Sequence, residues 1–244
     1  SFGTVLSDII FEQKSEIVYK ICPIGFSKRI DTNDFVLDIG SNDSTFLQYY
    51  SDKLKRYGCD PTGKQFMEYY GDVELIPTYF SKEAIQTNLG SNVRFKVISS
   101  ISMFYDLPNP VQFAKDIYEL LENDGIWTLE QSYVLTMLER NSIDTICHEH
   151  LEYYGIEQVV WILTAAGLKV IDVELNEVNG GSFSVTAAHK SSTREATQNV
   201  KMLMVSEAAL KTSTLAPYEE FNVSIKVKMF FYNPNSITII KILI

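Results

Sequence analysis

Cysteine and long apolar runs are scarce in this sequence. Its 244 residues include three cysteines, Cys22, Cys59 and Cys147, which lie far apart and form no Cys-x-x-Cys pair. Such an odd, scattered set argues against a disulfide framework and a structural zinc site, and it favours a reducing, cytoplasmic setting. The first twenty residues mix charged side chains among the apolar ones, so they predict neither a signal peptide nor a membrane span.

Positive charge is also in short supply. Lys and Arg total 21 against 31 Asp and Glu, which gives a net charge of −10. This balance argues against a nucleic-acid partner, because binding a phosphate backbone requires clustered cations. Hydrophobic residues make up 45% and charged residues 21% of the chain. That composition is typical of a globular protein and excludes a disordered or collagen-like chain.

Short apolar runs alternate with helix-like segments over most of the chain. The expected strands are Phe35–Gly40, Arg56–Asp60, Val73–Ile76, Phe95–Ser99, Ile126–Leu129, Leu168–Leu175 and Ser182–Ala188. The expected helices are Phe2–Ile21, Thr45–Leu54, Gly63–Tyr70, Ser81–Asn88, Val111–Leu121, Ile156–Ala166 and Thr193–Leu215. This alternation predicts an α/β, doubly wound, seven-stranded and mostly parallel sheet. Only a turn separates the last two strands, so they should pair antiparallel at one edge, as in the Rossmann-like class I methyltransferase type.

The character of the sequence changes after Lys190. We expect residues 1–190 to form a core with an N-terminal helix, and residues 191–244 to form a C-terminal helix with part of a second, altered domain. No acidic residue follows Glu220, and the apolar segment Ser236–Ile244 predicts a strand or an aggregation-prone run.

The connection after the first strand is the first candidate site. Gly40 permits a tight turn, and the amide groups after it can meet a carboxylate at the start of a helix. The acidic side chains there disfavour a phosphate and suit a cation. Together these features favour S-adenosyl-L-methionine, which carries an ammonium, a carboxylate and a sulfonium group; the alternative is a strand-to-helix turn with polar caps. The candidate cofactor-binding residues here are Asp38, Gly40, Ser41, Asn42 and Asp43.

Further cofactor contacts are expected where the next strands end. Asp60 ends the second strand, where an acidic side chain can accept hydrogen bonds from ribose hydroxyls; a turn residue before a proline is the alternative. Tyr79 and Phe80 follow the third strand and either stack on the adenine or belong to the core. Ser99 and Ser100 end the fourth strand, at the edge of the sheet where ligands bind in such folds.

Two of the three histidines lie together in one short block. His148, Glu149 and His150 are the candidate catalytic residues, because histidine is the usual general base near neutral pH and a neighbouring carboxylate can orient it. A metal site is the second interpretation, but no fourth ligand has a recognisable spacing, so we predict no metal. Polar residues without a chemical role are the third.

Four motifs between Asp34 and Lys190 resemble the nucleotide-sugar C-methyltransferases. They are Leu37–Asp43, Asp60–Phe66, Asp144–Tyr154 and Asn179–Ser182. The resemblance implies transfer of a methyl group from S-adenosylmethionine to a ring carbon of a keto-sugar. His150 matches the base that removes the proton beside the ketone, and Glu149 would orient or contact the sugar. The implied partner is therefore a small molecule, a nucleotide-sugar.

The chain departs from the family pattern at several positions. Ser44 stands where the family usually has glycine, Cys147 where many members have an active-site tyrosine, and Met103 lies near a position where some members have histidine. The tyrosines that could replace the missing phenol are Tyr105, Tyr133, Tyr153 and Tyr154. From the low cysteine count we also expect the family's N-terminal zinc segment to be missing. Two alternatives therefore stay open: an O- or N-methyltransferase for a small metabolite, and a degenerate domain that binds a cofactor or partner without catalysis.

Overall fold

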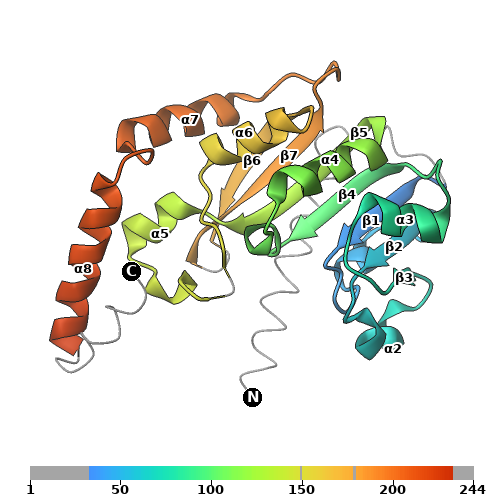
Figure 1. The fold of residues 1–244 in the computed structure, drawn as a ribbon, viewed down its shortest axis with the longest axis horizontal. Coiled ribbons are helices and arrows are strands. Elements are labelled where there is room, and N and C mark those ends of the chain that lie inside the picture. Colours follow the sequence, from blue (N-terminus) through green and yellow to red (C-terminus); the bar gives the residue numbers. More distant parts are fainter. Residues whose placement is uncertain (1–32, 149, 178–179, 233–244) are drawn as a thin grey trace.

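A computed structural model describes residues 33–148, 150–177 and 180–232. It is built around one seven-stranded sheet with the order β3-β2-β1-β4-β5-β7-β6 (Figure 1). The strands are β1 (Phe35–Ile39), β2 (Lys55–Cys59), β3 (Glu74–Ile76), β4 (Phe95–Ile101), β5 (Leu121–Ser132), β6 (Leu168–Asn176) and β7 (Ser182–His189). Strands β1 to β5 pair in parallel, and β7 runs antiparallel between β5 and the edge strand β6. The predicted fold class, including the antiparallel pair, is confirmed.

Helices and short 3-10 turns connect the strands. The α-helices are α2 (Met67–Tyr70), α3 (Lys82–Leu89), α4 (Pro110–Leu120), α5 (Val134–Arg140), α6 (Ile156–Ala165), α7 (Gln198–Leu210) and α8 (Ala216–Tyr232). The 3-10 turns are η1 (Phe46–Tyr49), η2 (Gly63–Phe66), η3 (Phe104–Asp106) and η4 (Ile143–Thr145). Local sequence fixes several ends: the Ser81 side chain accepts a hydrogen bond from Ala84 N at the start of α3, as predicted. None of the described helices is long and apolar enough to cross a membrane.

Two helix predictions need correction, and two helices are additional. Residues Thr45–Leu54 form only the turn η1, because Tyr50 is already extended and the chain enters β2 five residues later. The helix expected at Thr193–Leu215 is shorter: α7 begins at Gln198 and ends where Lys211 adopts the left-handed conformation. Helices α5 and α8 were not predicted. The expected helix Phe2–Ile21 and the tail Ser236–Ile244 lie outside the described residues.

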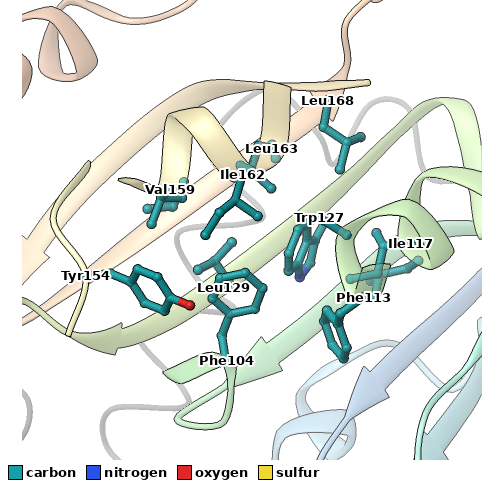
Figure 2. Close-up of a cluster of buried hydrophobic side chains, with 14 of the residues drawn as sticks. Phe104, Phe113, Ile117, Trp127, Leu129, Tyr154, Val159, Ile162, Leu163 and Leu168 are labelled. Carbon is teal, nitrogen blue, oxygen red and sulfur yellow. The ribbon is translucent and has the colours of Figure 1, made fainter. Parts of the chain in front are cut away.

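Aromatic packing fixes the position of η3, the turn that follows β4. Helices α4 and α6 lie over one face of the sheet, and the fully buried Phe104 of η3 lies beneath them (Figures 1 and 2). Its ring centroid is 5.6 Å from that of Trp127, 5.9 Å from Phe113 and 5.5 Å from Tyr154. Edge and tilted contacts of this kind add about 0.5–1.5 kcal/mol each to the burial itself. Residues next to Phe104 are therefore held against the carboxyl end of β4.

A buried carboxylate joins the C-terminal helices to the sheet. Glu207 of α7 is 1% exposed and accepts hydrogen bonds from the Tyr133 hydroxyl (2.8 Å), Ile156 N (2.6 Å) and Glu157 N (3.1 Å). The last two are free N–H groups at the start of α6, where the helix dipole also favours negative charge. A side chain at Gly155 would come within 2.8 Å of this carboxylate, so glycine permits the approach. Burial, and then the Glu207 charge, raise the pKa of Tyr133, which keeps its hydroxyl protonated as the donor.

We therefore expect Glu207→Ala to destabilise the protein strongly. The change leaves two buried donors and one part-buried donor without an acceptor, which should lower the free energy of unfolding by about 3–5 kcal/mol. Glu220→Ala, at an exposed position in α8, is the control and should change it by less than about 0.5 kcal/mol. Urea denaturation measures both. Equal effects of the two changes would show that the buried carboxylate does not stabilise the helices.

Candidate functional site

The loop after β1 turns sharply and is held by its own hydrogen bonds. Gly40, Asn42 and Ser44 all have positive φ angles, of 73°, 48° and 59°. Ser44 stands where glycine would be free of strain, and a left-handed serine costs about 1–2 kcal/mol. Its hydroxyl offsets this cost by donating to Tyr69 O (3.1 Å) and accepting from the Gln48 side chain (3.1 Å). The departure from glycine is thus accommodated by a tightly bonded loop.

Asp60 connects this loop to the end of β2. Its Oδ2 accepts a hydrogen bond from Asn42 N (2.9 Å), and its Oδ1 accepts two from Thr62, from the amide (2.7 Å) and the hydroxyl (2.6 Å). Both lone pairs of Oδ1 are therefore engaged, and Oδ2 retains one acceptor position. Asp60 is 8% exposed. The predicted cofactor residues Asn42 and Asp60 do lie together, with acceptor capacity for one ribose hydroxyl at Oδ2.

The other strand-end residues have different roles. Asp38 is buried, and its Oδ1 accepts a hydrogen bond of 2.6 Å from the hydroxyl of Ser99, its register partner on β4. Ser100 instead accepts a hydrogen bond from the indole of Trp127 (3.0 Å). Asp38 and Ser99 thus form a buried polar pair beside the loop, whereas Ser100 contributes its hydroxyl to the core. Asp43 accepts from Thr45 N (3.1 Å) and closes the loop.

The two aromatic candidates after β3 lie in different surroundings. Tyr79 is 81% exposed. Phe80 packs on Phe113 of α4, with ring centroids 4.8 Å apart, so it has the core role that the sequence left open. A contact with adenine stays a prediction for both residues.

Tyr70 belongs to the site but was missed by sequence reasoning. Its hydroxyl donates to Asn42 O (2.8 Å) and lies 3.0 Å from the Ser41 hydroxyl, so it supports the loop from below. Burial raises the pKa of Tyr70 to about 12, and the hydroxyl therefore stays protonated. Its partners lie 28 and 29 residues away, and no local pattern marks such a contact.

The geometry around His150 selects one tautomer. Its Nδ1 lies 2.9 Å from Thr145 O. A carbonyl oxygen only accepts, so Nδ1 carries the proton and Nε2 keeps a lone pair. His150 is half-buried, whereas His148 is exposed and Glu149 lies outside the described residues. Of the three candidate catalytic residues, His150 therefore has the geometry of an oriented base.

Two of the four candidate tyrosines lie beside His150. The Tyr105 ring centroid is 4.1 Å from that of the imidazole, and that of Tyr153 is 6.3 Å away. The Tyr133 hydroxyl is bound to Glu207, and Tyr154 packs on Phe104 in the core. Tyr105 and Tyr153 are therefore the phenols closest to the candidate base, near the half-buried Cys147.

The turn η3 brings the loop and the histidine to the same edge of the sheet. Met103, directly before η3, places its Cγ 3.5 Å from where a Cβ on Gly40 would stand. Within η3, the carbonyl of Tyr105 accepts hydrogen bonds from Leu151 N and Glu152 N, both 3.1 Å, directly after His150. The carboxyl ends of β1 and β4 thus meet there, which is where open α/β sheets bind ligands.

The chemical groups at this edge fit a cationic nucleoside better than a metal ion or a phosphate. The carboxylates of Asp38 and Asp60 suit an ammonium group and a ribose hydroxyl, and Gly40 leaves the turn free of a side chain. Among the described residues, no group of three or more His, Cys, Asp or Glu side chains is arranged to hold a metal ion.

Comparison with known proteins identifies the family of this chain. Residues 23–173 match the methyltransferase-domain family, and residues 177–229 match the C-methyltransferase C-terminal domain. The chain therefore belongs to the methyltransferase-domain family, and this family implies S-adenosylmethionine as the cofactor.

Three similar proteins illustrate these matches. Over 191 residues the chain is 27% identical to the C-methyltransferase NovU of Streptomyces niveus, an alignment that covers 77% of this chain and 45% of that protein. The chain thus spans less than half the length of this relative. The fold resembles the YcgJ protein of Bacillus subtilis (TM-score 0.55, 11% identity, 74% of this chain and 100% of that chain). It also resembles an S-adenosylmethionine-dependent methyltransferase of Clostridium acetobutylicum (TM-score 0.54, 10% identity, 76% and 94%).

We expect Tyr70→Phe to weaken binding of S-adenosylmethionine. Loss of the hydroxyl frees the Asn42 carbonyl and the Ser41 hydroxyl, so the dissociation constant should rise about 2–10-fold, the equivalent of one hydrogen bond. Tyr69→Phe is the matched control, because its neighbouring phenol is 57% exposed. Isothermal titration calorimetry compares the two. An unchanged affinity in Tyr70→Phe would show that this hydroxyl does not shape the cofactor site.

Proposed function

We propose that this chain provides the cofactor-binding core and the general base of a C-methyltransferase that acts on a nucleotide-linked keto-sugar. The supporting observation is the orientation of His150: its Nδ1 is bound to Thr145 O, which leaves a lone pair on Nε2, and η3 links its segment to the Gly40 loop. The name of the relative NovU and the match to a C-methyltransferase C-terminal domain support carbon as the methylated atom. The motif at Asp144–Tyr154 resembles that of the nucleotide-sugar C-methyltransferases, which supports a sugar as the substrate.

Different residues bind the cofactor and transfer the proton. Asp38, Asp60 and the Gly40 loop hold S-adenosylmethionine, which supplies an electrophilic methyl group when bound. The carbon beside the substrate ketone loses its proton to Nε2 of His150, and the electron pair of the broken C–H bond moves into the enolate. The enolate carbon then forms the new bond to the methyl carbon, while the bond from that methyl to sulfur would break and leave its electron pair on the sulfur of the demethylated product.

The surroundings of His150 suit this proton transfer. The imidazolium that forms keeps its Nδ1–H bonded to Thr145 O, so the ring holds its orientation before and after the transfer. A positioned general base of this kind contributes about 10²–10⁴-fold to the rate. Alignment of two bound reactants at one sheet edge adds to this effect, up to about 7–11 kcal/mol in ideal cases.

We expect His150→Ala to separate binding from chemistry. Affinity for S-adenosylmethionine should stay close to that of the unchanged protein, because the loop and the histidine lie on different segments. Exchange of the substrate's acidic proton with solvent should slow about 10²–10⁴-fold. Deuterium uptake at the carbon, followed by NMR or mass spectrometry, measures this step without methyl transfer. A parallel His148→Ala variant shows which histidine is the base. If exchange slows more in His148→Ala than in His150→Ala, His148 is the base instead.

Deuterium uptake also tests the type of acceptor. A C-methyltransferase must loosen a C–H bond, so deuterium from the solvent should enter a carbon position of the ketone substrate. An O- or N-methyltransferase acts on a hydroxyl or amine and leaves carbon-bound hydrogen in place. Methyl transfer to an oxygen or nitrogen, without any deuterium at carbon, would overturn the proposal.

A further inference from the structure

We propose that Tyr105 is a positioning residue that fixes the orientation of the His150 imidazole relative to the cofactor loop. This inference rests on the proposed role of His150 as the base. Neither the glycine motif nor the histidine block includes Tyr105, and its position is defined by contacts on both sides of the site.

The first argument is the contact between the two rings. Their centroids are 4.1 Å apart with an interplanar angle of 45°, and Tyr105 is 8% exposed. The hydrogen bond from Nδ1 to Thr145 O fixes one atom of the imidazole, but it still permits the ring to rotate about that bond. An aromatic ring against the imidazole restricts this rotation. The direction of the Nε2 lone pair is therefore set by two contacts, of which Tyr105 provides the second.

The second argument is the rigidity of the segment that carries Tyr105. Ser102 N donates to Glu130 O (2.7 Å), which ties the start of this segment to β5. Phe104 is fully buried against Trp127 (Figure 2). Burial raises the pKa of Tyr105, so the phenol is neutral against the imidazole. A ring carried by a segment that is tied to β5 and to the core is a fixed reference for its neighbour.

The third argument is that the same segment contacts both functional parts. Met103 packs toward Gly40 on one side, and the Tyr105 carbonyl binds the two amides that follow His150 on the other. The spacing between the cofactor loop and the base is thus set within three consecutive residues. Because a displacement of about 1 Å in a reacting group can cost about 10²-fold in rate, a residue that sets this spacing affects catalysis without touching the substrate.

Replacing the ring tests the proposal. Tyr105→Leu and Tyr105→Met both remove the aromatic face. Two variants are used so that the test still works if one of them does not fold. Both should slow deuterium uptake at the substrate carbon about 10–100-fold while S-adenosylmethionine affinity changes little. Tyr105→Phe keeps the ring and should retain most of the rate. The control is Tyr118→Leu, because Tyr118 also contacts a histidine, with its ring centroid 4.6 Å from that of His189 in an edge-on arrangement, but at the opposite end of the sheet. This change should leave the uptake rate unchanged.

An NMR measurement reports the ring contact independently of catalysis. The imidazole Hε1 resonance of His150, assigned with His150→Ala, should move towards that of an unstacked imidazole in Tyr105→Leu and hold its position in Tyr105→Phe. A resonance that does not move in Tyr105→Leu, or an uptake rate that stays unchanged there while His150→Ala slows it, overturns the role of Tyr105 alone. Uptake that is insensitive to His150→Ala overturns the proposed base, and the role of Tyr105 with it.

Discussion

The hydrogen bonds to the buried carboxylate of Glu207 hold together the two ends of the segment that carries His150. This segment runs from Tyr133 to Ile156. This carboxylate caps α6, the helix that directly follows the segment with His150, and it also binds Tyr133 at the end of β5. The same segment is attached to η3 through the Tyr105 carbonyl. The chain that follows the candidate base is thus anchored twice, to η3 through Leu151 and Glu152 and to the C-terminal helix α7 through the start of α6. The region that matches the C-methyltransferase C-terminal domain is therefore joined to the methyltransferase core by buried polar contacts.

The polar groups of the cofactor loop are largely bonded to one another. Asp60 holds the Asn42 amide, Tyr70 holds the Asn42 carbonyl, and Ser99 holds Asp38. Such second contacts orient the groups that face a ligand and keep the loop in one conformation. The proposed arrangement of His150 follows the same principle, because a backbone carbonyl and a neighbouring ring define its direction.

The sheet could be predicted from the sequence because buried parallel strands appear as short apolar runs, such as Phe35–Ile39, between turn residues. The helix expected after Gly40 was wrong because apolar residues alone do not reveal that Tyr50 must be extended for the chain to enter β2. Asp60 and His150 could be chosen as candidates because they lie inside motifs, and their roles stay predictions. Tyr70 and Glu207 were not, since their partners lie 28 to 74 residues away and only the folded chain brings them together.

The fixed shape of the Gly40 loop has a consequence for turnover. The loop is bent by hydrogen bonds within the protein, so little further ordering is needed when a ligand arrives. The demethylated product keeps the ammonium, carboxylate and ribose groups for which this edge is suited, and differs from the cofactor only at the sulfur. If this edge holds the cofactor as proposed, the product meets the same groups there and competes with fresh cofactor for the same loop.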